Sequence, residues 1–253
     1  MDATHGFTFD LPLLQAVSDW QRGGDAKQNR RRGAALKAAC QNLPSQFRES
    51  VLVCHRQIAL VKGGVWDLLG ENRLPEKISS WTTDLEIAKG FKGGVPPEGQ
   101  GYQGVIFSIK PPAGSVIVNL RELYQDPAFR DAMERNKSAI AAYAKGAGGC
   151  GDSQSEVVLE IDKLEQEDIY SMGGHSSPFE ELVAEAAKIY YGTASVTPEQ
   201  YEALLLKVEH TRGVAGPRWL NPEAMQRVLR RAAPHAERLR EVKKLQAQAA
   251  SEP

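Results

Sequence analysis

Cysteine is scarce in this chain of 253 residues, and the few copies form no pattern. Cys40, Cys54 and Cys150 are odd in number and far apart, with neither the spacing of a metal site nor a disulfide framework. Such usage favours a reducing cytosol. We therefore expect a cytoplasmic protein that holds no metal.

Long apolar runs are also missing from the sequence. No stretch approaches the roughly 20 apolar residues that a membrane-spanning helix needs. Residues 1–6 do not give the basic start and apolar core of a signal peptide. The sequence therefore predicts no membrane partner.

Neither sign of charge is in excess, since 31 Lys and Arg stand against 32 Asp and Glu, for a net charge of −1. This balance argues against a broad electrostatic nucleic-acid binder. Local basic stretches remain at residues 30–32 and along residues 222–248. The ordinary explanation of both is a solvated helical face. The alternative at 30–32 is a patch for phosphates or an acidic partner, and the alternative at 222–248 is docking of a substrate, an antitoxin or a nucleic acid. No glycine motif with the spacing of a phosphate-binding loop is present.

The apolar share of 42% and the charged share of 25% are ordinary for a globular protein. The length is enough for one large domain or for one domain with an appendage. Hydrophobic periodicity predicts an α+β fold. Helices are expected within 8–47, at 65–70, 120–144, 179–191, 197–210 and 222–248, and strands at 50–60, 78–83, 102–110, 115–119, 153–161 and 168–172. We expect a catalytic domain at 1–172, with a helical part at 1–47, followed by a helical extension at 173–253.

The most informative stretch reads Ser-Ser-Trp-Thr-Thr-Asp over residues 79–84. It places hydroxyl side chains around one Trp at the end of a predicted strand. Asp84 can cap a following helix, whose apolar residues recur at helical spacing up to Phe91. An ordinary strand end with a helix cap would explain the stretch by itself.

Two further strands carry unusual polar residues. Arg56 interrupts an apolar strand before this stretch, and Gln154 and Glu156 open another apolar strand after it. Residues two apart in a strand point to the same face, so we expect Gln154 and Glu156 to share one.

Arg, then Ser80-Trp81-Thr82, then Gln-x-Glu, each on a predicted strand, resembles the mono-ADP-ribosyltransferases of the Arg-Ser-Glu type. That family includes bacterial toxins and phage-encoded enzymes, and the resemblance covers roughly residues 50–172. It implies two facing, mostly antiparallel β-sheets that bind NAD as co-substrate. It also implies a toxin or host-modifying enzyme that is expressed in or delivered to a bacterial host, with an antitoxin or immunity protein as a partner.

The resemblance also implies roles for single residues. Glu156 would be the catalytic carboxylate, which stabilises the positive charge that develops on the ribose. Ser80 would orient Glu156 or hold the ribose, so it counts as both catalytic and cofactor-binding. Arg56 would grip the pyrophosphate with its planar fork. Gln154 would face the acceptor as a further catalytic residue.

Two neighbours of Ser80 complete the expected NAD site. Thr82 would help to bind the ribose. Trp81 could contact the nicotinamide, although core packing is the more usual role of such a Trp.

The acceptor is left open by the sequence. Relatives with Gln at the position of Gln154 modify amide or hydroxyl side chains of proteins, or nucleobases. A protein acceptor is the leading expectation, and ADP-ribosylation of RNA or DNA bases is the alternative. An inactive transferase-like binding module and an unrelated α+β domain are the remaining alternatives.

Overall fold

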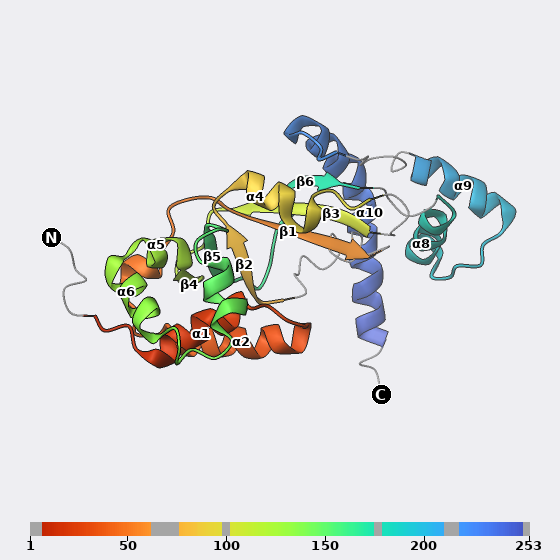
Figure 1. Cartoon of the computed structure of the whole chain (residues 1–253). Helices are drawn as coiled ribbons and strands as arrows, with labels where there is room; N and C mark the ends of the chain where they lie inside the picture. The colour runs from red at the N-terminus through yellow and green to blue at the C-terminus, as the bar shows by residue number, and fades with distance from the viewer. Residues whose placement is uncertain (1–6, 62–75, 98–101, 175–178, 210–217, 250–253) are drawn as a thin grey trace. The chain divides into compact units, whose positions relative to one another are not determined.

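The computed structural model describes residues 7–61, 76–97, 102–174, 179–209 and 218–249 (Figure 1). Its α-helices are α1 (Leu11–Gln21), α2 (Ala26–Ala39), α4 (Leu85–Gly90), α5 (Leu120–Gln125), α6 (Pro127–Asn136), α7 (Ala147–Cys150), α8 (Phe179–Tyr191), α9 (Pro198–Glu209) and α10 (Pro222–Ala249). Its strands are β1 (Cys54–Val61), β2 (Ile78–Thr82), β3 (Tyr102–Ile109), β4 (Val116–Asn119), β5 (Glu156–Glu160) and β6 (Ile169–Gly173). The helix expected at 65–70 lies outside the described residues.

The six strands form one hydrogen-bonded sheet in the order β4-β5-β2-β1-β3-β6. The pairs β1–β2, β2–β5, β4–β5 and β3–β6 are antiparallel. The predicted α+β fold is confirmed. The expected pair of facing sheets is not confirmed, because β1 lies between β2 and β3 in the sheet and joins all six strands into one.

The chain forms two compact units that interleave along the sequence. Unit 1 takes the described residues within Met1–Arg56, Leu74–Ala88 and Ser108–Asp162. Unit 2 takes those within Gln57–Arg73, Lys89–Phe107 and Lys163–Pro253. Unit 2 thus draws on segments on both sides of residue 172, and the functional boundary expected there stays a prediction.

Capping residues define where the first two helices begin. The Asp10 side chain accepts a hydrogen bond from the backbone N–H of Leu13, which caps α1. Asp25 and Gln28 form a reciprocal capping box at the start of α2. These bonds satisfy N–H groups that a helix leaves unpaired at its N-terminus.

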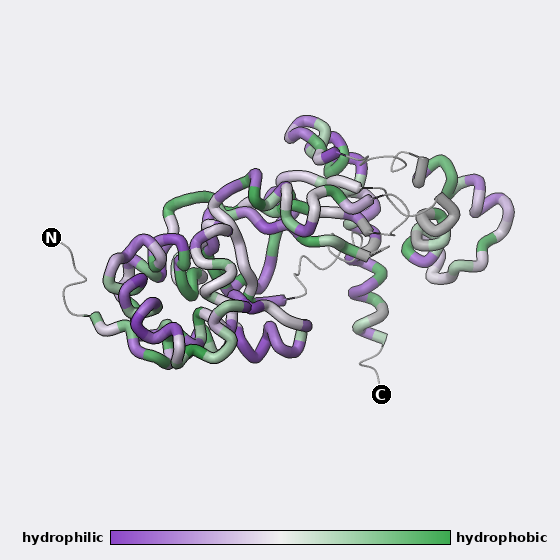
Figure 2. Tube along the Cα trace, in the orientation of Figure 1, coloured by the Kyte–Doolittle hydropathy of each residue, from purple (hydrophilic) through white to green (hydrophobic). Residues whose placement is uncertain are grey.

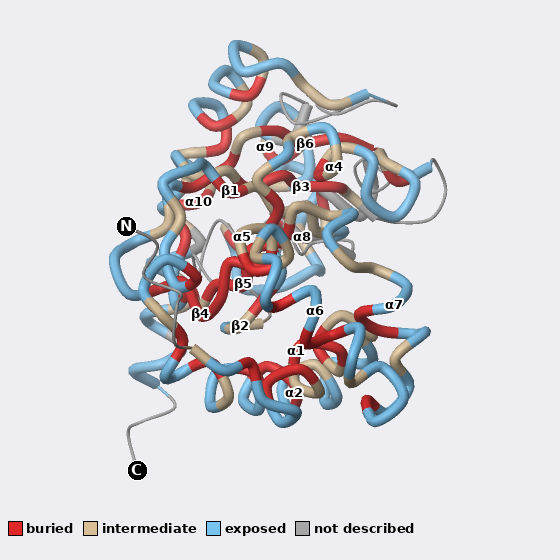
Figure 3. Tube along the Cα trace, turned by 60° about the vertical axis from the view of Figure 1, so that its left-hand side comes forward, coloured by how far each residue is buried: buried red, intermediate tan, exposed pale blue. Residues whose placement is uncertain are grey.

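The core of unit 1 lies between its helices and the β4–β5–β2 part of the sheet. It unites apolar residues of α1, such as Leu14 and Val17, with Val118 of β4 and Val158 of β5. Figure 2 shows hydrophilic and hydrophobic residues mixed along the helices of this unit, and Figure 3 shows β4 and β5 buried. Unit 1 therefore buries the strand that begins with Glu156.

One core cluster of unit 2 lies between α8 and α9 and includes Val183, Ala187 and Leu204. The indole of Trp219 lies against Gly104 and Gly173 of the paired strands β3 and β6. A Cβ at either glycine would come within 2.7 Å of that ring, so the glycines make room for the Trp.

The single helix expected at 120–144 is wrong. Asp126 is extended (φ −72°, ψ 120°), and Pro127 begins the new helix α6. A proline lacks the N–H that would continue the preceding helix, and it disfavours helical geometry in the residue before it. The Asp126 side chain then caps α6 by accepting from the N–H groups of Ala128 and Phe129.

Candidate active site

The pairing of β2 with β5 brings the predicted serine and glutamate together. Thr82 lies opposite Glu156, and Ser80 lies opposite Val158. Since side chains alternate along a strand, Ser80, Thr82 and Glu156 share one face of the sheet. Ser80 and Glu156 are diagonal neighbours on that face.

Glu156 is buried and accepts hydrogen bonds from side chains of β2 and α1. Its side chain belongs to a residue that is only 5% exposed. Glu156 Oε1 accepts hydrogen bonds from the Ser80 hydroxyl and from Trp20 Nε1, the latter at 2.7 Å. The side chain of Gln21 also donates to this carboxylate. A buried carboxylate with several donors is held in one orientation.

Burial and hydrogen bonding act on Glu156 in opposite directions. Burial raises the pKa of the Glu156 carboxyl above its usual range, and the bonds from Ser80, Trp20 and Gln21 work against that rise. Burial, and to a smaller extent the charge of Glu156, also raises the pKa values of Tyr124 and Cys150. Tyr124 and Cys150 are therefore neutral at pH 7.

Arg56 lies on β1 and reaches the backbone of β2. Its Nη1 donates to the carbonyl oxygen of Ser80 at 3.2 Å, and its Nη2 pairs with the carboxylate of Glu76. Its Nε is buried and has no hydrogen-bond partner among the described residues. Burial lowers the pKa of the guanidinium, and Glu76 opposes that shift. Two nitrogens of the Arg56 guanidinium are therefore hydrogen-bonded, and the third, Nε, has no partner among the described residues.

The other two residues of the Ser-Trp-Thr motif have local partners. Thr82 Oγ1 accepts from the N–H of Asp84 at 3.1 Å, at the turn into α4. Trp81 is 2% exposed and donates from Nε1 to the Ser79 hydroxyl at 3.0 Å. By strand alternation, Trp81 and Ser79 lie on the face opposite Ser80 and Glu156.

Gln154 does not lie in the strand that carries Glu156. It is half-buried in a turn, and β5 begins only at Glu156. Ser155 between them has a left-handed backbone with φ +45°. Strand alternation therefore does not relate these two side chains, contrary to the expectation from the sequence.

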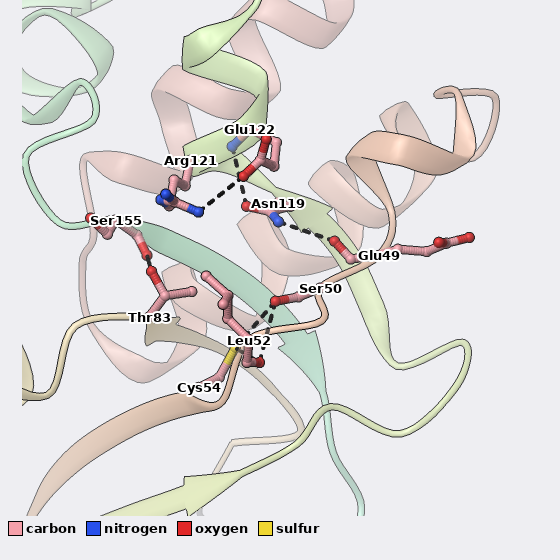
Figure 4. A network of polar contacts seen from close by, with 9 residues as sticks. All are labelled: Glu49, Ser50, Leu52, Cys54, Thr83, Asn119, Arg121, Glu122 and Ser155. Atoms are coloured by element: carbon pink, nitrogen blue, oxygen red, sulfur yellow. Dashed lines mark hydrogen bonds and ion pairs between the residues drawn. The ribbon is translucent and has the colours of Figure 1, made fainter. Parts of the chain in front are cut away.

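Further polar contacts fasten the ends of the strands around this turn (Figure 4). The backbone N–H and the hydroxyl of Thr83 both donate to the carbonyl of Ser155, at 3.1 Å and 3.5 Å. Asn119, at the end of β4, donates from Nδ2 to the carbonyl of Glu49 at 3.0 Å. The start of β5 is thereby fixed against the end of β2.

Sequence reasoning missed three partners in this site, namely Trp20, Gln21 and Glu76. In the sequence, Trp20 lies at helical spacing from Leu14 and Val17, and a Trp on such an apolar helical face needs no further explanation. Nothing in the sequence relates residue 20 to residue 156. The pattern of residue types therefore indicated the chemistry but not the side chains that support it.

Comparison with known protein families, curated proteins and solved structures found no match. No group of three or more His, Cys, Asp and Glu placed to hold a metal occurs in the described part of the chain. Of the helices that the structure describes, none combines the length and apolar character that crossing a membrane requires.

Proposed function

We propose that this protein is a mono-ADP-ribosyltransferase, which moves ADP-ribose from NAD to a macromolecular acceptor, most favourably a protein side chain. The observation that carries the proposal is the buried Glu156 carboxylate bound by Ser80 from the neighbouring strand. Arg56 contacts the same serine through its carbonyl. The proposal includes the transferase fold, with catalysis in residues 1–172 and a helical extension in 173–253.

The reaction needs a carboxylate beside the ribose. Cleavage of the bond to nicotinamide develops positive charge on the sugar, and a nearby carboxylate stabilises that charge. Glu156 supplies it in its ionised form. The Ser80 hydroxyl and Trp20 Nε1 both bind Oε1 in the structure, so these two contacts are made through one oxygen of the carboxylate.

Arg56 is suited to bind a pyrophosphate by exchanging partners. Guanidinium groups bind phosphate oxygens through paired N–H donors. Two of the donor nitrogens of Arg56 are engaged by Glu76 and Ser80, and the buried Nε has no partner among the described residues. An incoming phosphate would compete with Glu76 for the guanidinium.

The acceptor would meet the site near Gln154. An amide both donates and accepts hydrogen bonds, so it can orient an acceptor amide, hydroxyl or base edge without taking a proton. The short turn before β5 carries this amide within two residues of Glu156. Thr82 and Trp81 have less direct support, because each has a local partner in the structure.

Incubation with labelled NAD and cell lysate tests the proposal. We expect macromolecular label with the wild-type protein and almost none with Glu156→Gln. Loss of the label on protease treatment identifies a protein acceptor, and loss on nuclease treatment identifies ADP-ribosylation of RNA or DNA. A folded protein that labels nothing in lysates of several bacteria, and releases no nicotinamide, would contradict the proposal and favour a binding module.

A further inference from the structure

The last turn of α1 contacts both the candidate catalytic carboxylate and the chain segment that precedes it. Trp20 Nε1 donates to Glu156 Oε1 at 2.7 Å in a buried contact. Gln21 Nε2 donates to the carbonyl of Gly151 at 2.8 Å. Ser18 Oγ accepts from the N–H of Ala147 at 3.3 Å. The last turn of α1 is therefore hydrogen-bonded both to Glu156 and to the segment that precedes it in the chain.

We propose that Trp20 and Gln21 are positioning residues, which keep Glu156 ionised and aimed in the transferase site. This inference rests on the proposed function, because it gives the two side chains a purpose in that reaction. The geometry itself belongs to unit 1 alone.

The indole of Trp20 is suited to this role because it can only donate. A serine hydroxyl can either donate or accept, so Ser80 can remain bonded to both protonation states of Glu156. An ionised carboxylate is the stronger acceptor for the indole N–H. If Glu156 turned away, the buried Trp20 donor would lose its partner, which carries a free-energy cost.

Tyr124 fixes which end of the Gln21 amide faces the carboxylate. The Tyr124 hydroxyl donates to Gln21 Oε1 at 2.8 Å. The amide nitrogen of Gln21 is then left to donate to Gly151 and to Glu156. Gln21 thus presents N–H groups to the carboxylate and not its carbonyl oxygen.

The groups that face Glu156 from the surrounding elements are neutral at pH 7, so a change in the titration of this site can be assigned to Glu156. These are Ser80 from β2, Trp20 and Gln21 from α1, Tyr124 from α5, and Cys150 at the end of α7. Burial is the first cause of the raised pKa values of Tyr124 and Cys150, so both are neutral at pH 7. Removal of a donor should therefore act on the ionisation of Glu156 itself.

The direct test is an NMR titration of the full chain with ¹³C-labelled glutamate carboxyls. Glu156→Gln identifies the signal of Glu156 by its absence. We expect Trp20→Phe, which keeps a ring but removes the N–H, to move the midpoint of Glu156 to higher pH. Trp219→Phe is the matched control, because Trp219 Nε1 donates to the Lys89 carbonyl at 3.0 Å in unit 2. That control should leave the midpoint unchanged.

The kinetic readout uses the same variants. Trp20→Phe should lower kcat at pH 7 by about tenfold or more, the usual effect of one hydrogen bond to a charged group. It should leave the Kd for NAD nearly unchanged, and its rate should recover as the pH rises. A purely structural role would not move the acid limb of the pH profile.

The outcomes separate this inference from the proposed function. A midpoint that does not move in Trp20→Phe overturns the positioning role, even when the wild type transfers ADP-ribose. A midpoint that moves while the wild type transfers nothing overturns the transferase and leaves the control of Glu156 standing. If Trp20→Phe does not fold, Gln21→Met gives the same two readouts, since it keeps the volume and removes the amide donors.

Discussion

Glu156 illustrates how one residue can be important to the site and unfavourable to the fold. Burial raises the pKa of its carboxyl, so the folded state holds the proton more tightly than the unfolded chain does. By linkage, the stability that protonation provides is present at low pH and is lost as the pH rises through the folded-state pKa. At neutral pH the protein therefore loses stability by keeping this group ionised.

Glu156→Gln should accordingly raise the melting temperature at pH 7 to 8. The amide carries no charge, and its oxygen can still accept from Ser80 and Trp20. The gain should shrink as the pH falls towards the ordinary glutamate range, because the wild type then becomes neutral at this position too. Calorimetric melts across the pH range measure the difference.

Glu160→Gln is the matched control, at the other end of β5. Its carboxylate pairs with Lys37 at 2.5 Å and with Lys77 at 3.7 Å, so the substitution removes favourable charge contacts. This variant should not gain stability. Equal gains in both variants would contradict the account of Glu156.

Arg56 and Glu76 make a second prediction at the residue scale. Arg56→Ala should weaken NAD binding by about tenfold or more, and Arg56→Lys should restore little, since an ammonium lacks the paired fork. Glu76→Gln should bind NAD at least as tightly as the wild type, because the competing carboxylate is gone. Isothermal calorimetry measures all three, and unchanged affinity in folded Arg56→Ala would make Arg56 a structural residue.

Gln154 separates acceptor recognition from NAD chemistry. Gln154→Ala should lose most transfer to the acceptor and keep much of any slow hydrolysis of NAD. Both rates are measured on one preparation of the variant. If the two rates fall by the same factor, Gln154 serves the NAD site or the fold, and its assignment to the acceptor is wrong.

The residue types of the site could be predicted, but their supporting contacts could not. Ser80 and Glu156 meet because β2 and β5 pair in the register that puts Thr82 opposite Glu156. The sequence indicated both strands. The contact of Trp20 with Glu156 joins residues 136 positions apart, and helical periodicity only placed Trp20 on an apolar face.

At the scale of elements, the glycine-rich segment before β5 differs most from expectation. The glycine content of residues 145–153 predicts a flexible loop that could close on a second substrate. The structure instead has the short helix α7, with the segment bonded to Ser18 and Gln21 of α1. Several glycines here serve close packing, since a Cβ at Gly146 would lie 2.1 Å from the carbonyl oxygen of Ser18.

Gly146→Ala should therefore destabilise unit 1 by roughly 1–3 kcal/mol, the usual cost of overpacking. A Cβ at Gly146 would also lie 2.5 Å from the hydroxyl oxygen of Ser18, so the contact with Ser18 is the expected source of the loss. Gly90→Ala is the control, because a Cβ there meets nothing within 4 Å. Chemical denaturation measures the stability of both variants. An unchanged midpoint in Gly146→Ala would show that the segment moves to accommodate the Cβ, and would contradict the prediction.

At the scale of the whole molecule, the sequence predicted the class of fold but not the order of its strands. Period-two and helical patterns gave the α+β class and most of the elements. In this order β5 pairs with β2, although β3 and β4 lie between them in the chain, and local patterns carry no information on such pairing. The break between α5 and α6 could have been predicted from Asp126-Pro127, because a proline disfavours helical geometry in the residue before it. The apolar residues that recur at helical spacing across 120–144 favoured a single helix instead.

The central claim is that Glu156 acts at the transition state of ADP-ribose transfer, and one paired measurement tests it most directly. Turnover and NAD affinity are determined for the wild type and for Glu156→Gln, with both shown to be folded. The account predicts that turnover falls by about 100-fold or more while the Kd for NAD stays close to the wild-type value. A Glu156→Gln variant that transfers ADP-ribose at nearly the wild-type rate would contradict it.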